Sequence, residues 1–229
     1  MRRRATAEFA GTGLLLFAIV GSGMAVQDLP TPFARLSMNA IAVGACLAVL
    51  IALLAPISGA HLNPAVTLVA WRQRELTGTV ARTYIVAQTT GAIGGLVMAH
   101  IAFERALISI STTVRTGFGQ LVSEVIATFV IVVLIGVLTR THRRQLIPWT
   151  VGVWVAAGII ATPSTAFANP AVTLARSLTD TFAGIAPPSV PAIVLAQFFG
   201  ALLALVATAL LFPVHPTRPA LEVRKETLV

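Results

Sequence analysis

The sequence predicts an all-α membrane protein, in which six transmembrane helices and two short re-entrant half-helices form one bundle with an inverted repeat. Three observations support this fold class. Long stretches of the chain are apolar and uncharged, one polar hexapeptide occurs twice inside such stretches, and several markers recur in the same order in both halves. We expect residues 1–229 to form a single transmembrane domain.

The composition and the placement of charges indicate where the spans lie. Asp, Glu, Lys and Arg make up 10% of the chain, well below the roughly 25% that is usual in soluble domains. The charged residues are also clustered, which leaves apolar stretches long enough for helices of about 20 residues to cross a bilayer. The expected spans are about 7–27, 37–56, 81–103, 119–139, 147–163 and 190–213.

The first apolar segment has an alternative interpretation. Its basic start, MRRR, and the apolar run that follows also fit a cleavable signal peptide. Glu8 interrupts the apolar run, however, and the run is as long as a full span. A first transmembrane helix is therefore the favoured interpretation.

The net charge of +8 has a membrane explanation rather than a nucleic-acid one. In a six-span topology most cations fall on one side, and no basic soluble region is left to bind a nucleic acid. This bias is the positive-inside rule, so we expect a protein of the cell (inner) membrane with both termini, including a tail of 214–229, in the cytoplasm. The cations expected inside are Arg2, Arg3, Arg4, Arg72, Arg74, Arg82, Arg140, Arg143, Arg144, Arg218, Arg224 and Lys225, and those expected outside are Arg35, Arg105, Arg115 and Arg176.

The two halves of the chain carry the same markers in the same order. The pairs are AEFAGT with SEVIAT, NPAVTL with NPAVTL, and AQTTGA with AQFFGA, which contain Glu8 and Glu124, Asn63 and Asn169, and Gln88 and Gln197. We therefore predict two copies of one unit, at about 5–105 and about 117–213. Each copy holds three spans, and because three is odd, the second copy enters the membrane from the opposite face.

The repeated hexapeptide occupies parts of the chain that do not fit a simple span. The uncharged stretches 36–71 and 145–175 are each too long for one helix and too short for two helices and a turn. Each stretch therefore holds one span and an additional short element. That element contains NPAVTL, at 63–68 in the first half and at 169–174 in the second.

Each NPAVTL copy predicts the start of a short helix. The residue before a proline avoids the helical region, proline is favoured at the first helical position, and asparagine is a good helix cap. We therefore expect helices at about 64–72 and 170–178, too short to cross the membrane. The motif residues are Asn63, Pro64 and Ala65 in the first copy and Asn169, Pro170 and Ala171 in the second. The non-helical segments before them must be buried in protein or line a water-filled cavity.

Because the halves are inverted, the two short helices should meet near mid-membrane by their N-terminal ends. Each such end carries a partial positive charge of about half an elementary charge, and the amides of Asn63 and Asn169 add hydrogen-bond donors. A pore lined in this way repels cations and favours neutral hydrogen-bonding solutes. The sequence thus predicts a passive channel.

These features resemble the aquaporin, or major intrinsic protein, family. The likeness covers nearly the whole chain, and paired NPA motifs in inverted halves, each with its own Glu and AQxxGA segment, are a specific signature. The resemblance implies an aquaporin-like homotetramer in which each protomer has its own pore. It also implies that Glu8 and Glu124 hold the NPA loops through backbone hydrogen bonds. His61 would either line the cytoplasmic half of the pore or anchor its loop.

The resemblance also locates a selectivity filter, at which this chain departs from the family. The residue after the second NPA is usually Arg in the family and is Val172 here. By the family's spacing the other filter positions are Val43, Ala157 and Ala166, with Gly158 replacing Ala157 if the alignment has a one-residue gap. We therefore expect a wide, uncharged filter without an arginine. Similar Val-substituted filters occur in bacterial family members found beside arsenic-resistance genes.

Arg176 is a basic residue close to this filter in sequence. It lies four residues after Val172 and therefore shares that face of the short helix. It can stand in the extracellular vestibule, contact lipid headgroups or loops, or swing back into part of the place of the missing filter arginine.

Four functions remain in competition. The favoured one is a passive channel for small neutral solutes such as water, glycerol and metalloid hydroxides, including arsenous acid; a strict water channel is the first alternative. A coupled transporter can also be built from inverted repeats, but it usually needs titratable groups at its site. A structural membrane protein is the fourth. We expect no enzyme activity, cofactor or metal site, because the sequence shows no nucleophile–base pair and no ligand cluster.

Overall fold

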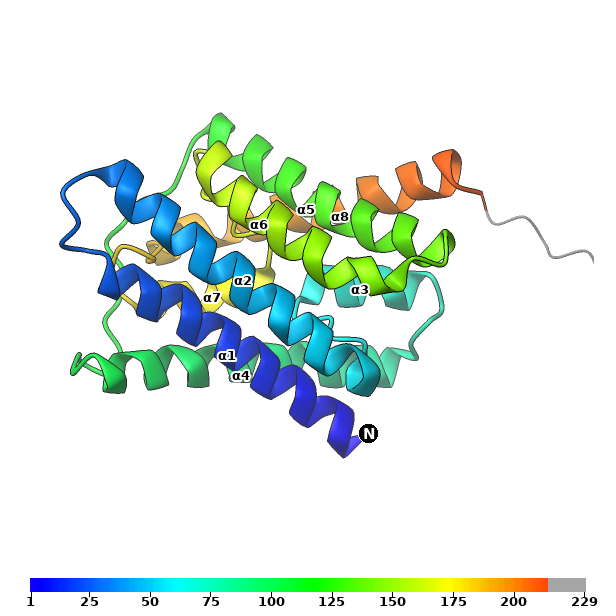
Figure 1. Cartoon of the computed structure of the whole chain (residues 1–229), viewed down its shortest axis with the longest axis horizontal. Helices are drawn as coiled ribbons and strands as arrows, with labels where there is room; N and C mark the ends of the chain where they lie inside the picture. Colours follow the sequence, from blue (N-terminus) through cyan, green and yellow to red (C-terminus); the bar gives the residue numbers. More distant parts are fainter. Residues whose placement is uncertain (214–229) are drawn as a thin grey trace, which may run out of the picture.

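The computed structural model describes residues 1–213, so the predicted tail of 214–229 lies outside the described residues. Within this range, long helices run side by side and two short helices lie among them (Figure 1). The long helices are α1 (Arg2–Ala25), α2 (Pro32–Ser58), α4 (Gly78–Ala102), α5 (Phe118–Arg140), α6 (Ile147–Ala161) and α8 (Val190–Leu211). Two 3-10 turns, η1 (Arg144–Leu146) and η3 (Pro187–Ser189), precede α6 and α8. The six are long and apolar enough to cross a membrane, α6 with η1 included, which confirms the predicted all-α membrane fold.

Four of the long helices, α1, α2, α4 and α5, begin earlier than their predicted spans, and the difference is largest at α1 and α2. α1 begins at Arg2 and α2 at Pro32. The prediction followed the uncharged apolar run, whereas a helix continues through interfacial residues until a cap ends it. At the start of α2 this cap is Thr31, whose Oγ1 accepts a hydrogen bond from the backbone N–H of Ala34 at 3.1 Å.

The two short helices are α3 (Pro64–Arg72) and α7 (Pro170–Ala175), and each starts at the proline of an NPAVTL copy. α3 has the predicted length, whereas the predicted second half-helix changes to a 3-10 turn, η2 (Arg176–Leu178), in its last residues. The two short helices contact each other, and each packs on both α4 and α8. They therefore join the two halves of the chain.

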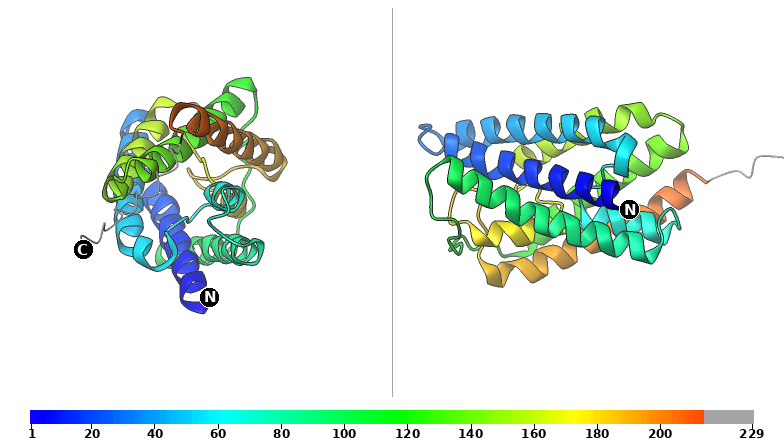
Figure 2. Two further views of the ribbon diagram at one scale, coloured as in Figure 1. Left: turned by 90° about the vertical axis from the view of Figure 1, so that its right-hand side faces the viewer. Right: turned by 90° about the horizontal axis from the view of Figure 1, so that it is seen from below.

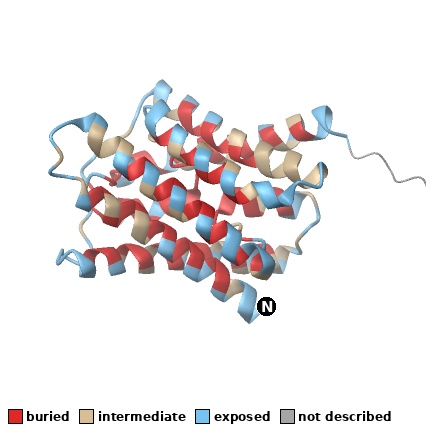
Figure 3. Cartoon of the chain, in the orientation of Figure 1, coloured by how far each residue is buried: buried red, intermediate tan, exposed pale blue. Residues whose placement is uncertain are grey.

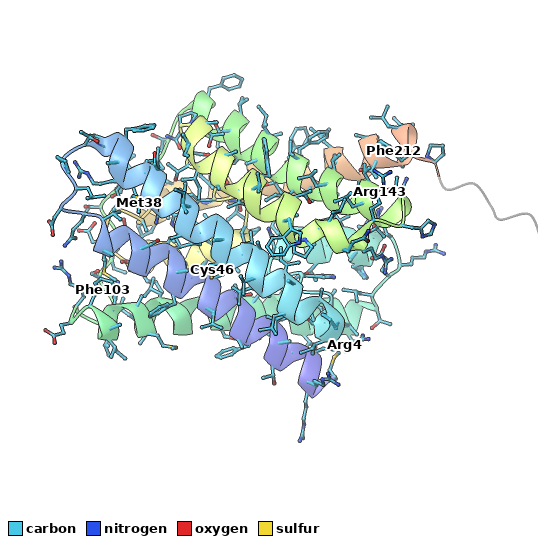
Figure 4. All side chains as sticks on the ribbon, in the orientation of Figure 1. Arg4, Met38, Cys46, Phe103, Arg143 and Phe212 are labelled. Atoms are coloured by element: carbon cyan, nitrogen blue, oxygen red, sulfur yellow. The ribbon has the colours of Figure 1, made fainter. Side chains whose placement is uncertain are left out.

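The halves run in opposite directions through the bundle. α1 begins at the end marked N, whereas its counterpart α5 begins at the opposite end (Figure 1). Viewed end-on, the long helices surround the interior (Figure 2, left). Arg4 and Phe212 lie at one end and Phe103 at the other (Figure 4). We call these the terminal end and the loop end, because the long segments 103–117 and 179–186 lie at the latter.

The outward faces of the long helices are apolar. Exposed and buried residues alternate along each long helix (Figure 3), and the exposed ones include Val49, Leu53, Val86, Val153, Leu195 and Leu210. The interior instead contains fully buried polar side chains, among them Glu8, Gln88, Glu124 and Gln197. This distribution suits a protein whose outer surface contacts hydrocarbon and whose polar groups must find partners inside.

Glycines allow the closest helix contacts, and they do so at matching places in the two halves. A Cβ atom at Gly91 of α4 would overlap the carbonyl group of Phe9 on α1. One at Gly200 of α8 would likewise overlap the carbonyl oxygen of Val125 on α5. Small residues at such crossings let helix backbones approach closely in membranes. These contacts bring Glu8 and Glu124 within reach of the centre of the bundle.

The crossing of α1 and α4 yields a stability test with an internal control. A Cβ at Gly95 would overlap the carbonyl oxygen of Gly13, whereas a Cβ at Gly94 would meet only the Phe9 ring, at 3.7 Å. We expect Gly95→Ala to lower the unfolding free energy by about 1–3 kcal/mol, because the helices must move apart. Gly94→Ala should be neutral or stabilising by up to about 1 kcal/mol, since alanine favours helix. Unfolding in detergent measures both, and equal effects would contradict the close crossing.

Candidate functional site

Both segments that lead into the short helices end in an asparagine cap. Asn63 has extended backbone angles (φ −156°, ψ 120°), and its Oδ1 accepts a hydrogen bond from the N–H of Ala65 at 2.9 Å. Asn169 (φ −151°, ψ 112°) accepts from the N–H groups of Ala171 and Val172 at 3.1 and 3.3 Å. The proline after each asparagine occupies the first helical position, where its missing N–H is not needed.

The same asparagines also bond to the opposite half of the chain. Nδ2 of Asn63 donates to the carbonyl oxygen of Ala168, and Nδ2 of Asn169 donates to that of Leu62, both at 2.7 Å. An amide nitrogen carries two hydrogens, so each asparagine keeps one for the cavity that it lines. α3 and α7 therefore meet by their N-terminal ends. The sequence predicted this meeting but not the pair of bonds that closes it.

Glu8 holds the first loop from a fully buried position on α1. Its Oε1 accepts from Ser58 Oγ at 2.6 Å and from the N–H of His61 at 3.0 Å. Its Oε2 accepts from the N–H of Leu62 and from Gln88 Nε2, both at 2.7 Å. All four partners donate, which matches an ionised carboxylate, a group that only accepts.

Glu124 does the same for the second loop from α5. Its Oε1 accepts from the N–H of Phe167 at 2.9 Å, and its Oε2 accepts from the N–H of Ala168 at 2.8 Å. Gln197 Nε2 donates to Oε2 at 2.6 Å. These are the backbone bonds that the family resemblance implies for both glutamates. The two glutamates differ in one partner: Ser58 bonds both Glu8 and the N–H of Ala60, whereas its counterpart Ser164 bonds the N–H of Ala166 and not Glu124.

The threonine of NPAVTL completes each network, a role that sequence reasoning missed. Thr67 Oγ1 lies 3.0 Å from Gln88 Nε2 and 3.1 Å from His61 Nδ1. Thr173 Oγ1 accepts from Gln197 Nε2 at 2.8 Å. The sequence did hold a signal for this role: the repeat extends past NPA to the threonine of NPAVTL, and this threonine recurs together with the glutamine in both halves.

Left-handed backbone angles turn the carbonyls of both loops. Positive φ values occur at Gly59 (91°), Ala60 (49°) and Leu62 (49°), and at the matching Thr165 (60°), Ala166 (44°) and Ala168 (48°). Within residues 1–213, no hydrogen bond is donated to the carbonyls of Gly59, Ala60, His61, Thr165, Ala166 and Phe167. These six residues line the cavity. Their oxygens are therefore available as acceptors for a solute.

A cavity of about 1200 Å³ runs through the bundle from one end to the other. Its lining includes Gln73 and His142 at the terminal end, Asn63 and Asn169 at the centre, and Phe182 at the loop end. The opposite wall is apolar and is formed by Leu15 and Ile19 of α1, Leu47 and Ile51 of α2, Ile131 and Ile135 of α5, and Val151 and Val155 of α6. Around its middle the cavity thus has one polar stripe in an apolar wall.

Three of the four expected filter residues line this cavity, and the fourth does not. Val43, Ala166 and Val172 are buried and face it. Ala157 is exposed on the outer side of α6 and is absent from the lining. It follows Val153 by four residues and therefore shares the outward face of the helix. The alternative, Gly158, is buried against Ala166 and is also absent from the lining.

The residue of α6 that faces the cavity beside the second loop is Ile159. It continues a stripe of lining residues at intervals of four, through Val151 and Val155. The placement of Ala157 by family spacing was therefore wrong, because the face of α6 decides which side chain enters the cavity. At this place a large branched side chain lines the cavity, where the sequence led us to expect a methyl group.

Arg176 lines the loop end of the cavity and also makes one of its expected loop contacts, with the segment 179–186. It is 7% exposed, its Nε donates to the carbonyl oxygen of Ala183, and its guanidinium lies 3.4 Å from the centre of the Phe167 ring. One helical turn separates it from Val172 along the cavity, about 6 Å. An arginine is therefore present near the filter, although not at the family's position.

A second arginine, Arg115 of the segment 103–117, lines the same end of the cavity. The sequence did not lead us to expect it at the site. Its Nε donates to the carbonyl oxygen of Gly184 at 2.9 Å, and its guanidinium lies 5.1 Å from the Phe167 ring centre. Burial lowers the pKa of Arg115, and the Glu124 carboxylate opposes that shift; an arginine remains charged near neutral pH. The residue lies between the two repeats, so no repeat marker pointed to it.

Comparisons with known proteins agree with this geometry. Residues 1–164 match the sequence profile of Major intrinsic protein. The chain is 45% identical over 220 residues to "Aquaglyceroporin AqpS" of Rhizobium meliloti (strain 1021), covering 96% of this chain and 93% of the relative. It is 36% identical over 105 residues to "Propanediol uptake facilitator PduF" of Citrobacter freundii, covering 45% of this chain and 38% of the relative.

The fold also resembles a solved structure. The X-ray structure of the aquaglyceroporin from Plasmodium falciparum matches with a TM-score of 0.70, over 90% of this chain and 94% of that chain. The two sequences are 18% identical, so the likeness concerns the fold alone.

The two asparagine functions, cap and cross-bond, can be separated by substitution. Asn63→Ala removes both and should cost about 1 kcal/mol from the cap alone. Asn63→Asp keeps an acceptor for the cap but loses the Nδ2 donor to Ala168. We expect both changes to slow solute flux through the cavity and to destabilise the protein, because the Asp carboxylate would place an acceptor against the carbonyl oxygen of Ala168. The same pair of changes at Asn169 should act similarly because the geometry is mirrored.

Stopped-flow swelling of proteoliposomes and thermal unfolding measure these effects at equal protein content. Wild-type flux in both alanine variants would show that the asparagines are not part of the conducting path.

Proposed function

The chain belongs to the major intrinsic protein family, whose members are channels rather than enzymes, and we propose that its cavity conducts water, glycerol and neutral solutes of similar size. One observation carries this proposal: around its middle the cavity has an apolar wall with a polar stripe of two amide donors and six carbonyls that accept no hydrogen bond within residues 1–213. A polyol can turn its hydroxyls to the stripe and its carbon chain to the wall. Such a solute exchanges its water contacts for equivalent ones at little cost.

Ions are expected to be excluded by desolvation. The middle of the cavity is walled by branched aliphatic side chains such as Val43, Ile131 and Val155. An ion that loses its hydration there without a paired countercharge pays a large free-energy penalty. The N-terminal ends of α3 and α7 add partial positive charge, which opposes cations in particular.

The proposed filter consists of Val43, Ile159, Ala166 and Val172, and it selects by size and desolvation. None of these side chains donates a hydrogen bond. The oxygen acceptors beside them belong to the loop carbonyls that accept no hydrogen bond within residues 1–213. A trihydroxy metalloid acid such as arsenous acid, which is neutral near pH 7 and similar to glycerol in size, fits the same requirements.

A strict water channel is the second candidate, and the position of Arg176 favours it. Its guanidinium lines the cavity one turn beyond Val172 and stacks on Phe167. If the two side chains close the loop end to solutes wider than water, glycerol is excluded there. Permeation of glycerol in the wild-type protein decides between the two candidates.

The membrane setting is proposed from the charge pattern and the exposed faces. Arg4, Arg82 and Arg140 lie near the terminal end, which the positive-inside rule places in the cytoplasm. The loop end then faces outward from the cell membrane. We further propose a homotetramer with one pore per protomer, as the family resemblance implies.

The channel proposal predicts rapid passage of neutral solutes without electrical current. Proteoliposomes that contain the wild-type protein should swell faster in a glycerol gradient than empty liposomes, and planar bilayers with the same protein should show no potassium conductance. A potassium current comparable to the glycerol flux would contradict the proposal. Swelling by water alone, without glycerol entry, would favour the strict water channel.

The filter proposal is tested by substitutions on the two faces of α6 and on α7. Ile159→Ala widens the proposed filter and should raise the ratio of glycerol to water permeability severalfold. Ala157→Leu, on the outward face, is the matched control and should leave the ratio unchanged. Val172→Arg adds charge and bulk, and it should reduce glycerol flux more than water flux. A changed ratio in Ala157→Leu together with an unchanged ratio in Ile159→Ala would contradict Ile159 as the filter residue and support Ala157, the position given by family spacing.

A further inference from the structure

Two arginines converge on one aromatic ring at the loop end of the cavity. The guanidinium carbon of Arg176 lies 3.4 Å from the centre of the Phe167 ring, and that of Arg115 lies 5.1 Å from the same point. Both residues line the cavity. Two like charges held so close in a partly desolvated place repel each other, and the repulsion grows as the local dielectric falls. The Glu124 carboxylate compensates part of this charge from a distance, which leaves two cations facing one anion.

The protein holds both guanidinium groups with carbonyl oxygens alone. Nε of Arg176 donates to Ala183, and Arg115 donates through Nε to Gly184 at 2.9 Å and through Nη2 to Phe182 at 3.5 Å. Within residues 1–213, neither guanidinium hydrogen-bonds a carboxylate. Both Nη groups of Arg176 are without a hydrogen-bond partner in the same range.

The acidic residues nearest in the chain are already engaged. Asp180 uses its Oδ1 to accept from the N–H and the hydroxyl of Thr112, at 2.9 and 3.0 Å. Glu124 binds the N–H groups of Phe167 and Ala168 and the amide of Gln197. The positive charge of the two arginines at the loop end is therefore not neutralised by a bonded acid of the described chain.

We propose that the loop end of the cavity binds a small oxyanion of the phosphate or carboxylate class at Arg115 and Arg176, which both line it. Guanidinium groups recognise such anions through paired N–H donors. The anion stops at this point, because the filter beyond it is apolar and a charge is costly to desolvate there. While it is bound, the anion occupies the path of neutral solutes and slows their flux. The flux effect rests on the proposed channel function, whereas the binding itself does not.

Inorganic phosphate is the probe for both effects. Equilibrium dialysis of radiolabelled phosphate with the purified protein in detergent measures binding without any flux. Glycerol swelling of proteoliposomes, with phosphate on both sides and choline chloride of equal ionic strength as the control, measures the block. When phosphate equals its dissociation constant, half of the channels are occupied and the glycerol rate should fall about twofold.

Arg115→Gln and Arg105→Gln form the matched pair of variants. Arg105 lies in the same segment 103–117, is exposed and does not line the cavity. We expect Arg115→Gln to lose phosphate binding and phosphate sensitivity, and Arg105→Gln to keep both. Arg115→Lys should retain part of the phosphate binding, because lysine keeps the charge but lacks the paired N–H donors of the guanidinium group. Equal losses in Arg115→Gln and Arg105→Gln would indicate general surface attraction and overturn the site.

Wild type alone also decides the proposal if the variants do not fold. Absence of phosphate binding in dialysis, or a glycerol rate that phosphate leaves unchanged despite binding, would overturn it.

Liposomes of phosphatidylcholine and of phosphatidylglycerol distinguish the source of the anion. Equal sensitivity in both lipids supports a soluble anion, whereas a low rate in phosphatidylglycerol that no longer responds to phosphate would assign the arginines to a lipid headgroup. A wild-type protein that binds phosphate but conducts no glycerol would fail the channel proposal and leave the binding site standing.

Discussion

The requirement that backbone polar groups at membrane depth find partners governs this structure. Two non-helical loops enter the bundle, and each is held by one buried carboxylate, Glu8 or Glu124, that accepts two successive backbone N–H groups. With the N–H groups bound on that side, the carbonyls of both loops are left for the cavity. The carboxylates thus produce both the stability of the loops and the polar stripe on which the proposed function depends.

The two halves of the chain make matching contacts at the centre of the cavity, and they differ at its two ends. Mirrored contacts hold both loops, and the cross-bonds from Asn63 and Asn169 lock them together. Toward the loop end the match is lost, because His61 of the first loop corresponds to Phe167 of the second. The guanidinium groups of Arg115 and Arg176 lie over the Phe167 ring, whereas His61 contacts Tyr84 and Thr67. Selectivity is therefore expected at the end where the repeat no longer holds.

The sequence was sufficient for the features that periodicity and repetition control. Six spans, two half-helices and the paired asparagine caps follow from apolar length, from proline chemistry and from the repeat. The α6 filter position could not be predicted in this way, because spacing along the chain does not say which face of a helix points inward. Arg115 is a similar case: it belongs to an irregular segment between the repeats and reaches the cavity through tertiary contacts with Phe167, the segment 182–184 and Ser189.

The central claim is that the two loops form one interlocked unit at the middle of the bundle. A double-mutant cycle on the unfolding free energy, with Glu8→Gln, Glu124→Gln and the double variant, tests it most directly, with the exposed Glu104→Gln as the control. Because each loop is bonded to the other through an asparagine, releasing the first should weaken the hold on the second. We expect the double variant to lose less than the sum of the single losses, by at least about 0.5 kcal/mol. Strict additivity would show that each loop is held independently and would contradict the account.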